Sequence, residues 1–97
     1  MTETTAMLRK KLKIVNNLGL HARAAAKLVS CASRYGCKIE LTHNQRHADG
    51  KSILGVMTLG ATKGTELEVT LEGEAAQEQA ALHAIEELIN NRFGEDE

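Results

Sequence analysis

The sequence contains no proline and no tryptophan, and its 97 residues include one tyrosine and one phenylalanine. So few aromatic rings leave almost nothing to stack on nucleobases, and a net charge of −1 offers no basic surface for a phosphate backbone. No apolar run is long enough to span a bilayer, and the opening MTETTAM lacks the basic and apolar regions of a secretory signal. We therefore expect no nucleic-acid binding, no membrane insertion and a cytoplasmic location.

Cysteine is also scarce, since the chain has only Cys31 and Cys37. With His43 and His47 they form the pattern C-x5-C followed by H-x3-H, which suggests zinc as one alternative. Zinc fingers, however, place two to four residues between their cysteines and about a dozen between the cysteine pair and the histidine pair. The spacing here argues against a finger, and we expect two reduced thiols with no metal and no other cofactor.

Length and composition favour one globular domain. A chain of 97 residues with 42% apolar and 26% charged residues can build one hydrophobic core but hardly two. We expect this domain to span residues 1–97, with frayed tails at 1–7 and 94–97. Basic residues are concentrated in the first third and acidic residues in the last third, an asymmetry that could steer an acidic partner toward the basic end.

Changes in hydrophobic periodicity divide the chain into strands and helices. Alternating apolar residues predict strands over 8–15, 37–42 and 66–71, and a short further strand falls within 43–50. Helical spacing predicts one helix that begins after His21 and a long final helix after Gly73. Ser52 fits the N-cap of a short helix over 52–59.

The order of these elements predicts an α+β fold. Each alternating strand needs one covered face, and each helix offers one apolar stripe, so helices on a single side of an antiparallel sheet satisfy both. We therefore expect an open-faced β-sandwich in which a four-stranded antiparallel sheet carries three helices on one face, in the order βαββαβα.

His21 stands where the first helix is expected to begin, in the stretch LGLHARAAAKLV (18–29). The backbone amides of the first turn, including those of Ala22 and Arg23, have no carbonyl partner within the helix and can bind an anion. The Arg23 guanidinium can clamp phosphate oxygens, and imidazole is a nucleophile that is uncharged near neutral pH. A phosphate site fits this pattern, but so does a histidine that only caps the helix.

Two motifs, GLHARAAAKLV (19–29) and KSILGVMTLGATKGTELEVTLEGE (51–74), resemble the histidine-containing phosphocarrier (HPr) family of the bacterial phosphotransferase system. The similarity extends over roughly residues 8–93 and includes the nitrogen-branch type, NPr. It implies that His21 accepts a phosphoryl group on Nδ1 from enzyme I, which phosphoenolpyruvate charges, and passes it to a IIA-type component. It also implies that Arg23 is the active-site arginine and that Ser52 is the target of an HPr kinase/phosphorylase. The protein would then be a phosphoryl carrier and not an enzyme, and we expect a monomer.

The resemblance leaves two points open. Members commonly have proline after the active-site arginine, where this chain has Ala24, so the sugar and nitrogen branches both remain possible. The alternative function is a regulatory docking module that acts mainly through phosphorylation of Ser52. In either case we expect a partner-binding surface of apolar and basic side chains near His21, formed by Leu20, Lys27, Lys51, Ile53, Leu54 and Met57.

Overall fold

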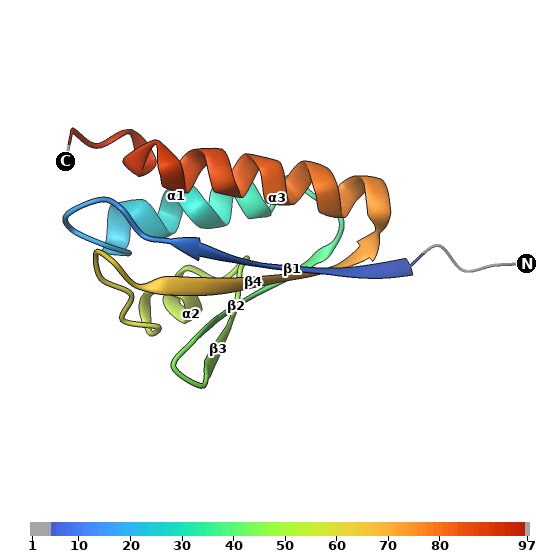
Figure 1. Ribbon diagram of the computed structural model, residues 1–97, viewed down its shortest axis with the longest axis horizontal. Coiled ribbons are helices and arrows are strands. Elements are labelled where there is room, and N and C mark those ends of the chain that lie inside the picture. The colour runs from blue at the N-terminus through green and yellow to red at the C-terminus, as the bar shows by residue number, and fades with distance from the viewer. Residues whose placement is uncertain (1–4, 97) are drawn as a thin grey trace, which may run out of the picture.

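The computed structural model describes residues 5–96, which form a four-stranded antiparallel sheet covered by helices (Figure 1). The strands are β1 (Thr5–Lys13), β2 (Lys38–His43), β3 (Arg46–Asp49) and β4 (Glu66–Glu74), in the sheet order β1-β4-β2-β3. The helices are α1 (Ala22–Ala32), α2 (Ile53–Met57) and α3 (Ala75–Asn90), followed by the 3-10 helix η1 (Arg92–Gly94). The predicted βαββαβα order and fold class are confirmed, and η1 is an addition to them.

The two faces of the sheet differ because side chains alternate along each strand. On the face toward the helices, Leu12 lies opposite Leu67 in the β1–β4 pair, and both side chains are buried. On the other face, Lys11 lies opposite Glu68, so charges of opposite sign face each other across the strands. This second face is the open side of the sandwich.

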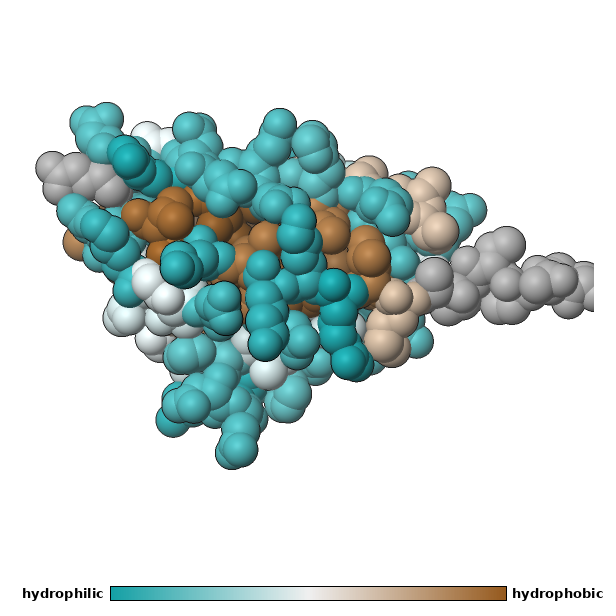
Figure 2. Space-filling view, viewed as in Figure 1, coloured by the Kyte–Doolittle hydropathy of each residue, from teal (hydrophilic) through white to brown (hydrophobic). Residues whose placement is uncertain are grey.

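All three α-helices lie on the apolar face of the sheet. Helix α3 runs along β1 and β4, and α1 packs beside α3. Helix α2 packs against α1 and β3, where Gly55 lies over Ala48, whose strand partner is the buried Leu41. In the space-filling view, apolar residues appear between the helices and the sheet and polar residues surround them (Figure 2). Among residues 5–96, no helix is both long enough and apolar enough to cross a bilayer.

The segment after α3 folds back onto the core instead of leaving it. Phe93 is 0% exposed and belongs to the hydrophobic core. Arg92 and Phe93 both have left-handed backbone angles, with φ of 56° and 54°, a conformation that costs on the order of 1–3 kcal/mol for each such residue. Burial of the large aromatic ring offsets this cost and holds the chain end against α1.

Regular structure extends into both segments predicted to be frayed tails, because residues 5–7 belong to β1 and Gly94 belongs to η1. β1 begins at Thr5, three residues before the expected start, because pairing with β4 continues to Glu74. At the other end, Gly94 lies in η1 and the Glu95 side chain accepts hydrogen bonds. The predicted tail residues 1–4 and 97 lie outside the described residues.

We predict that Phe93→Ala lowers the free energy of unfolding by about 3–5 kcal/mol, because the substitution leaves a cavity beneath the chain end. Urea denaturation followed by circular dichroism measures this change. Leu54→Ala is the control, since Leu54 is 77% exposed and its truncation should alter stability by about 0.5 kcal/mol or less. Equal losses for the two variants would contradict the core role of Phe93.

Candidate functional site

His21 is the N-cap of α1, as predicted. Its extended backbone (φ −72°, ψ 179°) directs its own carbonyl to accept the Ala25 N–H at 2.8 Å, the first hydrogen bond of the helix. Its ring Nδ1 accepts the Arg23 N–H at 3.3 Å. The ring therefore lies against the amides of the first turn, where the helix dipole favours negative charge.

A close approach between two loops holds the segment before His21. The Leu20 N–H donates to the Ala61 carbonyl at 2.9 Å, and Gly19 has φ of +65°. A Cβ at Gly19 would lie 2.5 Å from the Ala61 oxygen, so only glycine fits. The close neighbour of Gly19 is therefore the chain's own α2–β4 connection.

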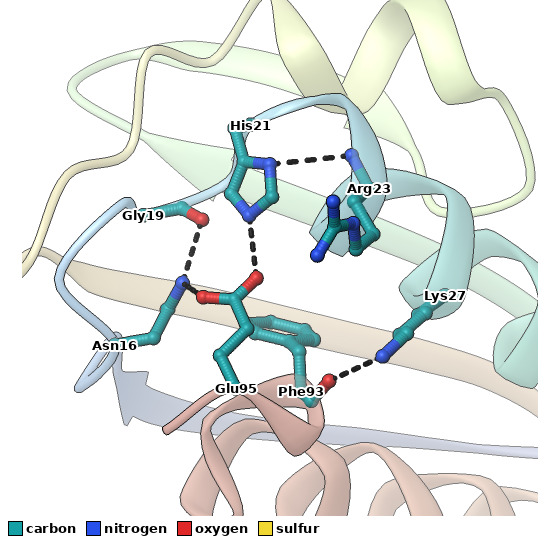
Figure 3. Close-up of polar contacts among 7 residues, drawn as sticks. All are labelled: Asn16, Gly19, His21, Arg23, Lys27, Phe93 and Glu95. Atoms are coloured by element: carbon teal, nitrogen blue, oxygen red, sulfur yellow. Dashed lines mark hydrogen bonds and ion pairs between the residues drawn. The ribbon is translucent and has the colours of Figure 1, made fainter. Parts of the chain in front are cut away.

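The other ring nitrogen faces a carboxylate from the end of the chain (Figure 3). His21 Nε2 lies 2.5 Å from Glu95 Oε2. The buried Asn16 side chain holds the second carboxylate oxygen, because its Nδ2 donates to Glu95 Oε1 at 2.9 Å and to the Gly19 carbonyl at 2.9 Å. His21, Asn16 and Glu95 thus form one network that joins the β1–α1 loop to the chain end.

This network assigns the proton of the neutral ring. A neutral imidazole has one donor nitrogen and one acceptor nitrogen. Nδ1 accepts the backbone N–H of Arg23, so the proton lies on Nε2 and points at the Glu95 carboxylate. The His21 side chain is 27% exposed, which leaves the ring accessible to a partner.

The same network lowers the pKa of the Glu95 carboxyl. The hydrogen bond from His21 is the largest cause, and the hydrogen bond from Asn16 and the electrostatic attraction of His21 and Arg23 act in the same direction, while burial opposes them. Because the pKa is lower in the folded protein than in the unfolded chain, the contact stabilises the fold above the ordinary pKa of a glutamate. This contribution is lost as the pH falls through the lowered pKa.

Two basic residues of α1 line a cavity beside the network. Arg23 is exposed. Together with Lys27 and Glu95, it lines a cavity of about 600 Å³. The Lys27 ammonium donates to the Phe93 carbonyl at 2.6 Å, so this lysine holds the chain end (Figure 3). Arg23 supplies the positive charge beside the ring, while the charge of Lys27 is shared with the backbone of the chain end.

Helix α2 begins at the predicted cap. Ser52 Oγ accepts the Gly55 N–H at 3.1 Å, and the residue is partly exposed. Three apolar side chains of this helix are exposed, as the predicted partner surface requires: Ile53, Leu54 and Met57. The short helix therefore presents apolar groups to solvent next to a serine.

Two other members of the predicted partner surface, Leu20 and Lys51, contact other parts of the fold. Leu20 is 6% exposed and belongs to the core, so its prediction as a contact residue was wrong, and Leu18 is 68% exposed instead. Gly19, with its left-handed backbone, stands between the exposed Leu18 and the buried Leu20. Lys51 donates its ammonium hydrogens to the carbonyls of Tyr35 and Cys37, at 2.7 and 2.9 Å, and so ties the α1–β2 connection.

The sequence analysis missed Asn16, Phe93 and Glu95. Asn16 directly follows the predicted strand 8–15 and Glu95 lies in the predicted tail 94–97, so neither belongs to a periodic segment. One signal was available: Phe93 is the only phenylalanine of the chain and stands in an otherwise polar ending. A lone large apolar residue there indicates that the chain end returns to the core.

Comparisons of the sequence and of the structure with known proteins all match the same family. The family model described as "PTS HPr component phosphorylation site" matches residues 8–91, a span that includes His21, Arg23 and Ser52. The chain is 54% identical over 88 residues to the phosphocarrier protein HPr of Pseudomonas aeruginosa, covering 90% of this chain and 96% of that protein. It is 45% identical over 91 residues to HPr of Neisseria meningitidis serogroup A, and this match covers 94% of this chain and 100% of that protein. The crystal structure of HPr-C-His from Thermoanaerobacter tengcongensis superposes with a TM-score of 0.85 at 34% identity, covering 93% of this chain and 99% of that one.

We predict that His21→Ala raises the pKa of Glu95 toward the ordinary glutamate value, because the substitution removes the strongest hydrogen bond to its carboxylate. A titration of the side-chain carboxyl carbons by NMR measures the change. His83→Ala is the control, since the His83 ring lies near Glu87 on α3 and does not contact Glu95. If the Glu95 pKa is the same in wild type and His21→Ala, the contact does not exist in solution.

Proposed function

This chain belongs to the HPr family of phosphocarrier proteins of the phosphotransferase system, and we propose that His21 is its phosphoacceptor. His21 receives the phosphoryl group from enzyme I and donates it to a IIA-type component. The observation that carries this proposal is the placement of an accessible imidazole at the N-terminus of α1, with Nδ1 directed at the first-turn amides. A protein of this family is a phosphocarrier and does not itself turn over a substrate.

The chemistry of the transfer follows from the two ring nitrogens. The lone pair of Nδ1 attacks the phosphorus of the donor, so that an N–P bond forms as the bond to the donor's leaving group breaks. The proton on Nε2 stays where it is. The Arg23 amide, which now contacts Nδ1, can then bind a phosphoryl oxygen, together with the Ala22 amide and the Arg23 guanidinium.

Reversibility is the reason for a histidine at this position. In the onward step the phosphorus is attacked by the nucleophile of the acceptor protein, and the neutral ring leaves with its proton still on Nε2. The amides and the guanidinium of α1 lie ready for the phosphoryl oxygens in both directions. Because they need no rearrangement between the two steps, the same site serves the donor and the acceptor.

We place the docking surface on α2 and the β1–α1 loop. Ile53, Leu54 and Met57 are exposed on α2, and Leu18 is exposed just before His21. A small apolar patch around a polar centre suits short-lived contacts with several partners. In this proposal the protein acts as a monomer in the cytoplasm, where its two buried thiols stay reduced.

Regulation through Ser52 is the second function that we propose. Ser52 is partly exposed, and its hydroxyl caps α2 directly before the apolar patch on that helix. Phosphorylation by an HPr kinase/phosphorylase would add nearly two negative charges beside Ile53 and Leu54. The phosphate is tolerated at the helix start, yet it would hinder the docking of acidic or phosphorylated partners.

We predict that incubation with phosphoenolpyruvate and enzyme I phosphorylates the wild type and not His21→Ala, since only His21 lies at the amides of α1. The product should be labile in acid and stable in alkali, which gel electrophoresis after each treatment detects. His83→Ala is the matched control, because the His83 ring is 75% exposed on another helix, α3, where it lies 3.4 Å from Glu87. Phosphorylation of the His21→Ala variant at a comparable rate would refute the assignment.

We predict that Ser52→Asp slows phosphoryl transfer to His21, because it adds a negative charge beside the docking patch. Aspartate is a good N-cap, so α2 should remain folded. Ser30→Asp adds the same charge on α1, in the groove facing α3, and should transfer at the rate of the wild type. Equal rates for the wild type and Ser52→Asp would count against the regulatory role.

A further inference from the structure

The last residues of the described chain form a strap, residues 92–96, that crosses back to the phosphoacceptor. Phe93 anchors the strap in the core, and Lys27 of α1 binds the Phe93 carbonyl at 2.6 Å. Within the strap, the Arg92 guanidinium donates to the Asp96 carbonyl at 3.1 Å. These contacts place the strap against α1 independently of any contact to the His21 ring.

Glu95 is the one strap residue whose side chain reaches the His21 ring. Its carboxylate meets Nε2, the nitrogen opposite the proposed site of phosphorylation, and Asn16 holds the other carboxylate oxygen. The Glu95 side chain is 12% exposed, so water screens this contact only weakly. Asn16 is itself fixed by the Gly19 carbonyl, and the carboxylate therefore has a defined position relative to the ring.

We propose that Glu95 is a positioning residue for the phosphoryl transfer, which holds the proton on Nε2 and balances the positive charge of the phosphorylated ring. This role rests on the proposed function of His21. When Nδ1 forms its bond to phosphorus, the ring nitrogen gives up its lone pair and the ring becomes cationic, with the proton retained on Nε2. A carboxylate at Nε2 stabilises that cation through a charge-assisted hydrogen bond.

The retained proton matters for the onward step. If the phosphorylated ring loses the Nε2 proton, the group that must leave is an imidazolate, which is a poor leaving group. If the proton stays, the ring leaves as neutral imidazole while the acceptor's nucleophile takes the phosphoryl group. Glu95 therefore keeps the carrier in its transferable form over a wider range of pH.

Other charged groups surround the ring and act on the same equilibrium. Arg23 and Lys27 extend from α1, and both disfavour a cationic ring, although the Lys27 ammonium is bound to the strap. Lys63, from the α2–β4 connection, contacts the Asn17 side chain at 2.7 Å. Asp96 is the other carboxylate of the strap and is exposed. Among the carboxylates of residues 5–96, Glu95 is the one that hydrogen-bonds to the ring, so its removal should have a larger effect than removal of Asp96.

The test compares Glu95→Gln with Asp96→Asn. The first variant keeps the size and the hydrogen-bonding ability of the side chain but removes the charge at the ring, and the second removes one charge from the adjacent residue. Each protein is phosphorylated with phosphoenolpyruvate and enzyme I, and the phosphohistidine signal is titrated by phosphorus NMR. We expect the midpoint of the phosphohistidine titration to fall by about one pH unit or more in Glu95→Gln and to stay at the wild-type value in Asp96→Asn.

The rate of onward transfer gives a second readout. The rate of onward transfer should begin to decline at a lower pH in Glu95→Gln than in the wild type or Asp96→Asn. If Glu95 had only a structural role, its substitution would lower the rate equally at every pH. The positioning role would be overturned if wild type and Glu95→Gln had the same titration midpoint and the same pH profile. That outcome would leave the phosphocarrier function intact. If the wild type itself forms no phosphohistidine, the proposed function fails instead. If enzyme I phosphorylates Asp96→Asn and not Glu95→Gln, the result supports a role for Glu95 at the site.

Discussion

The start of α1 at His21 is the constraint on which the site depends. A helix leaves its first amides without intrahelical partners, and here the residue that begins the helix also carries the imidazole. Nδ1 of the ring therefore faces backbone donors that no other group of the helix can satisfy. The site needs no cluster of catalytic side chains, because the backbone supplies donors wherever such a helix begins.

The remainder of the fold keeps that helix start in place. The β1–α1 loop is tied to the α2–β4 connection by the Leu20–Ala61 hydrogen bond, and Gly19 permits the approach. The apolar face of the sheet holds α1 and α3 side by side, and α3 carries the chain end back to the same point. Two loops and the end of the chain thus converge on one ring, although they are far apart in sequence.

The two sides of the ring have different chemical environments. Arg23 and the amides make the Nδ1 side favourable for a phosphoryl group, while Glu95 and Asn16 place negative charge and a hydrogen-bond acceptor on the Nε2 side. An imidazole between a positive and a negative environment keeps its proton on the negative side. The polarity of the site therefore agrees with the proposed phosphorylation of Nδ1.

The sequence alone determined the order of strands and helices, the two faces of the sheet and the position of His21 at a helix start. These features depend on alternation, on helical spacing and on capping, which neighbouring residues encode. Tertiary structure alone decided that Leu20 is buried and Leu18 exposed, that Lys51 binds the α1–β2 connection, and that Glu95 reaches Nε2 of the ring. Glu95 is 74 residues from His21 in the chain, and no local pattern encodes a contact over that separation. It forms because burial of Phe93 turns the chain end back toward α1, a result that requires the assembled core.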